Sequence, residues 1–118
     1  MPGISIHVVD VSRGIVASGM RVDLFAIAGD ASDRLIASGR LSKTGVLDDP
    51  ALNQTFAPGF YDARFHIGDY YRDAIGVTTA VPFLDVVSYR FGLAEPEAHY
   101  HLPMKCTPWG YSCFRGGA

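Results

Sequence analysis

Apolar and polar residues alternate along most of the chain, a period of two that is typical of β-strands with one buried face. In the first such stretch Ile4, Ile6 and Val8 share one face, and Ser5 and His7 share the other. The alternation predicts strands over residues 4–11, 20–27, 35–41, 56–67, 83–91, 99–106 and 111–115. We therefore expect a mainly β protein, a two-sheet β-sandwich of about seven to eight short strands.

Turn-forming residues separate these stretches, and one short segment has a helical pattern instead. Residues 29–33 form a loop rich in Gly, Asp and Ser. In residues 69–76, DYYRDAIG, apolar side chains recur four residues apart, and Gly76 is placed to end a helix. So short a helix is stable only when it docks against a sheet. No repeat or linker divides the chain, so we expect a single domain over residues 1–118.

The composition is that of an ordinary globular domain and excludes some classes of partner. Of the 118 residues, 48% are hydrophobic and 19% are charged, which suffices for a core. The formal net charge is -2, so nothing suggests a nucleic-acid partner. No apolar run approaches the roughly 20 residues of a membrane-spanning helix. Residues 1–3 lead into the first strand without a signal-peptide pattern, and we expect a cytoplasmic protein.

The two cysteines, Cys106 and Cys113, flank a Pro-Trp-Gly turn at residues 108–110. They could face one another across a hairpin, but cytosolic cysteines usually stay reduced, and we expect free thiols. The chain has no CxxC pattern or other cysteine spacing typical of a metal site.

Histidines supply the candidate chemistry of this sequence. His99 and His101 are separated by one residue, so in a strand both side chains lie on the same face. Such a pair can bind a metal, can act as a general base with a helper, or can be exposed polar residues. His7 and His66 lie on the polar faces of their own strands, where exposure to solvent is the simplest interpretation.

Val46 and Leu47 interrupt an otherwise polar loop over residues 42–50. Apolar side chains in a loop can mark the docking place of a ligand, and they can equally close the edge of the core. The pattern leaves both interpretations open.

Taken together, several segments resemble the 5-hydroxyisourate hydrolase family, the transthyretin-related enzymes of purine breakdown. The matching segments are IHVVD with His7, the GFYDARF strand, the Tyr-rich helix, the VSYRF strand, and a final hairpin that reads HYHLP followed by TPWGYSCFRGG. They occur in the family's order and with similar spacing over residues 4–117. The final hairpin is the family's signature.

The resemblance implies a two-sheet sandwich that assembles as a homotetramer, with active sites in clefts at the subunit interface. Enzymes of this family hydrolyse a ring amide bond of 5-hydroxyisourate without a metal or organic cofactor. By the same resemblance, His7 and His101 are the catalytic histidines of this chain, in roles that stay open between them. The further residues expected to line the substrate site are Val46, Leu47, Phe114, Arg115 and Gly117.

Some of these positions depart from the family's pattern. Val46 follows Gly45 where the family has an arginine, and Phe114 and Gly117 replace a tyrosine and a serine of the terminal motif. A guanidinium would bind the acidic edge of hydroxyisourate through charge-assisted hydrogen bonds. Methyl groups on the ring nitrogens remove those donors and favour an apolar wall. We therefore expect a preference for a trimethyl-5-hydroxyisourate, the substrate of a branch that takes part in methylxanthine (caffeine) breakdown.

Two alternatives stay open. In the first, the protein hydrolyses ordinary 5-hydroxyisourate of urate breakdown, with Lys105 as a replacement cation because it shares the strand parity of His101. In the second, the chain is a non-catalytic transthyretin-like binding protein that has kept an interface channel but lost its chemistry.

Overall fold

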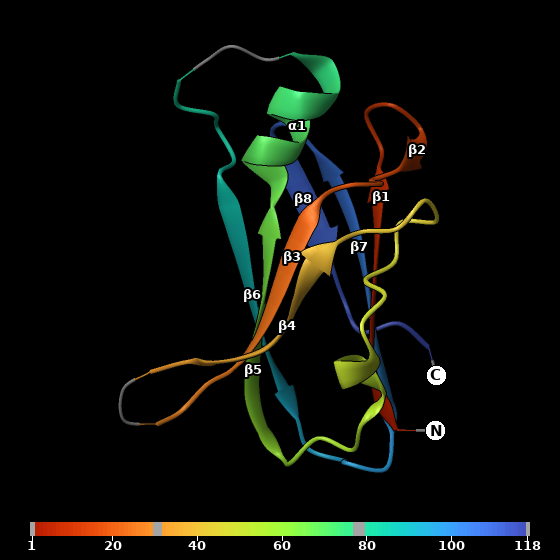
Figure 1. The fold of residues 1–118 in the computed structure, drawn as a ribbon, viewed down its shortest axis with the longest axis vertical. Coiled ribbons are helices and arrows are strands. Elements are labelled where there is room, and N and C mark those ends of the chain that lie inside the picture. The colour runs from red at the N-terminus through yellow and green to blue at the C-terminus, as the bar shows by residue number, and fades with distance from the viewer. Residues whose placement is uncertain (1, 30–31, 77–79, 118) are drawn as a thin grey trace.

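The computed structural model describes residues 2–29, 32–76 and 80–117. In chain order the elements are β1 (Gly3–Asp10), β2 (Ile15–Val16), β3 (Arg21–Ala26), β4 (Arg34–Arg40), the 3-10 helix η1 (Pro50–Asn53), β5 (Gly59–His66), α1 (Ile67–Ile75), β6 (Val86–Leu93), β7 (His99–Thr107) and β8 (Gly110–Cys113). They form two four-stranded sheets, ordered β2-β1-β7-β8 and β4-β3-β5-β6, as Figure 1 shows. The expectation of a two-sheet sandwich with one short α-helix is confirmed.

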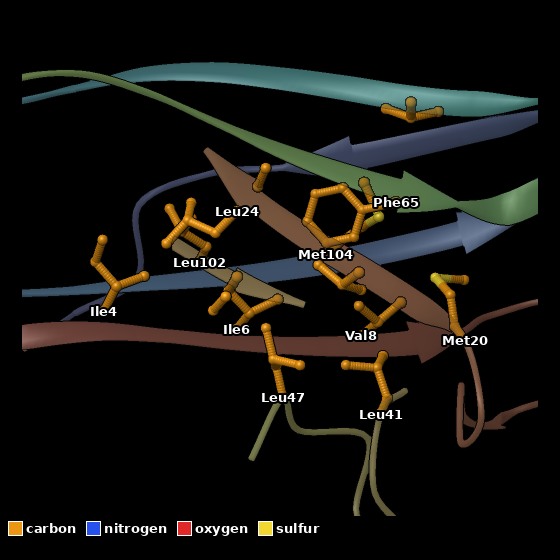
Figure 2. Close-up of a cluster of buried hydrophobic side chains, with 14 of the residues drawn as sticks. Ile4, Ile6, Val8, Met20, Leu24, Leu41, Leu47, Phe65, Leu102 and Met104 are labelled. Carbon is orange, nitrogen blue, oxygen red and sulfur yellow. The ribbon is translucent and has the colours of Figure 1, made fainter. Parts of the chain in front are cut away.

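The core lies between the two sheets and is built from the apolar half of each alternating strand. Figure 2 shows side chains of β1 and β7 facing those of β3 and β5. Its largest fully buried members include Phe65, Ile4, Ile6, Leu24, Leu102 and Met104. Because side chains alternate across a strand, burying this half directs the other half of β1 and β7 outward.

The first and last long strands lie side by side and run parallel. β1 pairs with β7 over its whole length, with Gly3 opposite His99 and Asp10 opposite Cys106. A parallel pair needs a long crossover, here nearly the whole chain. The arrangement brings the N-terminal strand against the C-terminal hairpin.

Hydrogen bonds to a buried carboxylate hold helix α1 against the end of β1. Asp10 is fully buried and accepts hydrogen bonds from Tyr70 (3.0 Å), Tyr71 (2.7 Å) and Ser12 (2.6 Å). Gly76 ends the helix in a left-handed conformation, with a φ of 67°. The expected helix therefore forms, beginning at Ile67, and it docks on the sandwich as its length requires.

Some predicted boundaries differ from those observed. The short strand β2 is not expected from the sequence, and β6 begins at Val86, which pairs with His66, the last residue of β5. His66 is only partly exposed, because its Nε2 lies 2.8 Å from the Asp23 carboxylate. The centre of the predicted loop 29–33, residues 30 and 31, and the terminal residues 1 and 118 of the predicted domain lie outside the described residues.

The hairpin keeps the cysteines apart. The register of β7 and β8 places Cys106 opposite Tyr111 and Cys113 opposite Met104, and both cysteines are free thiols. Among the described residues, no helix is both long enough and apolar enough to cross a membrane.

Candidate active site

The outer face of the β2-β1-β7-β8 sheet holds most of the histidines of the chain. β1 contributes Ser5 and His7 to this face, and β7 contributes His99 and His101, all partly buried. The register places Ser5 opposite His101, and His7 lies two residues farther along β1. The parallel pairing thus gathers imidazoles from both ends of the chain on one surface.

Ser5 lies between His99 and His101 and is hydrogen-bonded to both. Its Oγ is 2.8 Å from Nε2 of His99 and 2.6 Å from Nδ1 of His101. These bonds orient both rings, and they leave Nε2 as the nitrogen of His101 that Ser5 does not engage.

Val46 lies opposite His7 on the same outer face. The two residues form an isolated antiparallel bridge, supported by a hydrogen bond of 3.1 Å from the Leu47 N–H to the Ile6 carbonyl. Residues directly opposite one another in an antiparallel pair point to the same side of the sheet. The side chain at position 46 therefore borders His7.

Leu47, the next residue, points the other way. It is 4% exposed and belongs to the core, where Figure 2 shows it beside Ile6 and Val8. The expectation that Leu47 lines the substrate site does not fit this position. Of the two interpretations of this loop, closing the core edge applies to Leu47, whereas Val46 faces outward.

The end of the chain returns to the same surface through Gly116. This residue forms an isolated antiparallel bridge with His101, and its N–H donates to the His101 carbonyl at 2.7 Å. His101 is therefore flanked by Ser5 on one side and by Gly116 on the other.

The surroundings of His101 favour its neutral form. Partial burial lowers its pKa below the ordinary histidine value, and the neighbouring His7 and His99 lower the pKa further, while a hydrogen bond to the Ser5 backbone opposes them. Burial removes water from a charged ring, and nearby imidazolium charges repel it. A neutral imidazole near neutral pH has a lone pair that can accept a proton.

The other predicted residues of the C-terminal motif are placed differently. The Arg115 guanidinium stacks on the ring of Tyr100, 4.0 Å from its centroid. Tyr100 lies between His99 and His101 in β7, so its buried ring is on the opposite face of the strand. Phe114 is 45% exposed, and a Cβ at Gly117 would meet open space. Arg115 thus points away from the histidines within this chain.

No metal cluster accompanies these histidines in the described part of the chain. Over residues 2–29, 32–76 and 80–117, no group of three or more His, Cys, Asp or Glu side chains could hold a metal ion. Lys105 is exposed and lies opposite Val9, which puts it about 13 Å along β7 from His101. His7, which faces Val46, lies opposite Pro103, only two residues from Lys105, so Lys105 stays a candidate for the replacement cation.

A separate apolar groove of about 710 Å³ lies between α1, residues 81–84 and the β7–β8 turn. Its lining includes Tyr71, Phe83 and Trp109, and none of the histidines. Tyr71 directs its hydroxyl to the buried Asp10, so the described lining of this groove offers no free acid–base group. The residues that can transfer protons lie on the surface around His101.

A family model described as the HIUase/Transthyretin family matches residues 4–116. The chain belongs to the HIUase/transthyretin family. The 5-hydroxyisourate hydrolase 2 of Rhizobium meliloti is 42% identical over 112 residues, covering 93% of this chain and 92% of the relative. The 5-hydroxyisourate hydrolase of Deinococcus radiodurans is 36% identical over 116 residues, covering 98% and 96%.

Two solved structures have the same fold. The structure titled (S)-allantoin synthase matches with a TM-score of 0.85 and 31% identity, over 98% of this chain and 43% of that one. The Klebsiella pneumoniae 5-hydroxyisourate hydrolase matches with a TM-score of 0.78 and 23% identity, over 99% of this chain and 100% of that one. The transthyretin-like sandwich expected from the sequence is therefore confirmed.

Within this family fold, one residue of the histidine surface was missed by sequence reasoning. The sequence pattern predicts that Ser5 shares a strand face with His7, but it indicates no role for Ser5. Its importance follows from the pairing of β1 with β7, which sets Ser5 opposite His101. The available signal was its position two residues before His7 on the polar face of the strand.

Proposed function

We propose that this chain is a cofactor-independent hydrolase that opens the ring amide of 5-hydroxyisourate. The single observation that supports this most is the placement of His7 and His101 on one accessible sheet face, with His101 oriented by Ser5. The relatives described above are named 5-hydroxyisourate hydrolases, which supports the unmethylated substrate over the methylated one expected from the sequence.

Ring opening by water needs groups that move protons, and the histidines can supply them. One neutral imidazole takes a proton from water while the water oxygen attacks the ring carbonyl carbon. The other imidazole stabilises the developing charge or protonates the departing ring nitrogen. Because the departing ring nitrogen takes up one proton and water gives up one, the reaction needs no further reactant.

A second candidate is a preference for an N-methylated form, and Val46 is the observation that favours it. Its apolar side chain borders His7 where the sequence resemblance expects a guanidinium. Each methyl group buried against such a wall contributes about 0.8 kcal/mol. An unmethylated ring would instead leave acidic N–H groups facing an aliphatic side chain, at a cost of about 1 to 3 kcal/mol for each unsatisfied group.

We also propose that the chain assembles as a homotetramer with the histidine surface at a subunit interface. The support is the exposure of aromatic side chains near the final hairpin, where Trp109, Tyr111 and Phe114 are 72%, 48% and 45% exposed. A contiguous group of exposed apolar side chains often marks an interface. Light scattering tests the assembly, and a stable monomer at micromolar concentration would contradict both the tetramer and the interfacial site.

The decisive experiment supplies freshly generated 5-hydroxyisourate and its trimethyl analogue in parallel. Loss of absorbance is followed against the spontaneous rate for the wild type and for His7→Asn and His101→Asn. Each substitution should lower turnover by a factor of about 10² to 10⁴, the range for general acid–base groups. The double variant should be far from additive if the histidines act as one unit.

Two outcomes would replace the proposal. Failure of the wild type to accelerate either substrate would favour the non-catalytic binding protein. Loss of activity on chelation, restored by zinc, would favour the metal interpretation of His99 and His101.

A further inference from the structure

The hydroxyl of Ser5 joins two imidazoles but has only one proton to donate. With Oγ at 2.6 Å from Nδ1 of His101 and 2.8 Å from Nε2 of His99, it can donate to one ring at most and must accept from the other. The proton positions on the two rings are therefore coupled through Ser5.

This coupling decides what His101 can do at its other nitrogen. If Ser5 donates to Nδ1 of His101, the neutral ring carries its proton on Nε2 and cannot accept one from water. If Nδ1–H of His101 donates to Ser5, Nε2 has a free lone pair and can act as a base. The Ser5 hydroxyl then donates its hydrogen bond to Nε2 of His99.

We propose that Ser5 and His99 form a positioning pair that holds His101 in the tautomer protonated at Nδ1, so that Nε2 of His101 is the base. This inference rests on the proposed hydrolase function and assigns the roles that it leaves open. Among the described residues, no side chain is hydrogen-bonded to the ring of His7, whereas His101 is oriented by Ser5. A base whose ring is held by a third group is the usual arrangement for proton transfer.

The proton balance follows from this assignment. Water gives a proton to Nε2 of His101 while its oxygen bonds to the ring carbonyl carbon. The C–N bond of the ring amide then breaks, and the departing nitrogen takes the same proton back from Nε2. Between these steps His101 is an imidazolium, and its bond from Nδ1–H to Ser5 strengthens because the donor is charged. His7 is left to hydrogen-bond the developing charge on the substrate.

Substitutions at position 5 test the pair, with a matched serine elsewhere as the control. Ser5→Ala should lower kcat by about 10- to 100-fold with little change in KM, as expected when a group that orients a functional histidine is lost. Ser5→Thr keeps the hydroxyl and should restore most of the activity. Ser38→Ala removes a partly buried hydroxyl from the Asp23 and His66 cluster on the other sheet, and it should leave kcat unchanged.

Substitutions at position 99 test the second half of the pair. His99→Gln retains an oxygen that can accept the Ser5 proton, and it should keep activity within about tenfold of the wild type. His99→Phe removes the acceptor and should resemble Ser5→Ala. Equal activities of the Gln and Phe variants would overturn the role of His99.

Nitrogen NMR of the imidazoles gives a readout that does not depend on activity. The wild type should show His101 protonated at Nδ1, and Ser5→Ala should shift it toward the Nε2–H tautomer. Wild-type His101 protonated at Nε2, or a tautomer unchanged in Ser5→Ala, would overturn the inference even in an active enzyme. Conversely, the expected tautomers in a protein that opens neither substrate would refute the hydrolase function while leaving the Ser5 coupling in place.

Discussion

Gly116 lies so close to the ring of His101 that a larger residue there must displace the ring. A Cβ at position 116 would be 2.7 Å from Cδ2 of His101 and 3.3 Å from Cδ of Pro103. The bridge that binds Gly116 to the His101 backbone prevents the chain from moving away easily. Glycine at this position therefore permits the observed orientation of His101.

Gly116→Ala should consequently disable the site without unfolding the protein. A displacement of a functional group by about 1 Å can cost about 10²-fold in rate, and we expect a loss in kcat/KM of that order. Steady-state assays paired with thermal unfolding measure the two effects. Gly29→Ala is the control, because a Cβ there meets no atom within 4 Å. Equal kcat/KM for Gly116→Ala and the wild type would show that His101 tolerates the shift.

Substituting His7 should change the titration of His101. Burial, followed by the charges of His7 and His99, lowers the pKa of His101 below its ordinary value of 6.5. His101 thus stays neutral near neutral pH. The value of kcat/KM should begin to fall only when the pH drops below 6.5. His7→Asn removes one repelling charge, so the pKa of His101 should rise toward 6.5.

An NMR titration of the His101 ring measures this pKa directly. His66→Asn is the control, since His66 contacts Asp23 on the other sheet and should leave the His101 titration where it is. An unchanged His101 pKa in His7→Asn would mean that the two rings do not influence one another.

The contacts of Asp10 should make stability depend on acid pH. Burial raises the pKa of Asp10, but hydrogen bonds from Ser12, Tyr71 and Tyr70 outweigh it and lower the pKa below 3.8. Because the folded pKa is depressed, the stabilisation is present above the unfolded value and is lost as pH falls through the folded one. Tyr71→Phe should therefore cost about 1.5 to 3 kcal/mol near neutral pH, as for a hydrogen bond to a charged group.

Urea unfolding at about pH 7 and about pH 3 measures this difference, which should shrink at the lower pH. Tyr61→Phe is the matched control, because the buried Tyr61 hydroxyl donates to the neutral carbonyl of Ala57 at 2.6 Å. Its cost should be similar at both pH values. A pH-independent effect of Tyr71→Phe would show that Asp10 is not the group responsible.

The sequence predicts local structure here better than it predicts neighbours across the fold. Period-two alternation locates the long strands, because burial of one face is a local property. It does not reveal that β1 pairs in parallel with β7, since that register is set by packing between segments about a hundred residues apart. The link from Ser5 to His99 and His101 depends on this register.

The loop residues Val46 and Leu47 illustrate the same limit at short range. Both are apolar and adjacent, so composition assigns them one role. Pairing of this loop with β1 turns Leu47 into the core and leaves Val46 beside His7. The strand β2 was missed for a related reason, because its two residues, Ile15–Val16, follow a turn and are too few to show a period.

The identity of residue 46 should decide between the unmethylated and methylated substrates. Val46→Arg places a guanidinium beside His7, where an acidic, unmethylated ring can accept its hydrogen bonds. Ring methyl groups can neither accept those bonds nor balance the charge, and a buried unpaired charge costs several kcal/mol. Activity on the trimethyl substrate should therefore collapse, while activity on 5-hydroxyisourate should rise or fall much less.

The measurement is the ratio of kcat/KM for the two substrates, because specificity is that ratio. Val46→Leu is the matched control, since it keeps an apolar wall and should preserve the wild-type ratio. If the wild type prefers the trimethyl form and Val46→Arg inverts the ratio, Val46 selects the methylated ring. If the wild type already prefers 5-hydroxyisourate, the apolar side chain of Val46 does not determine which substrate is preferred. A ratio that Val46→Arg leaves unchanged would mean that this side chain does not touch the substrate.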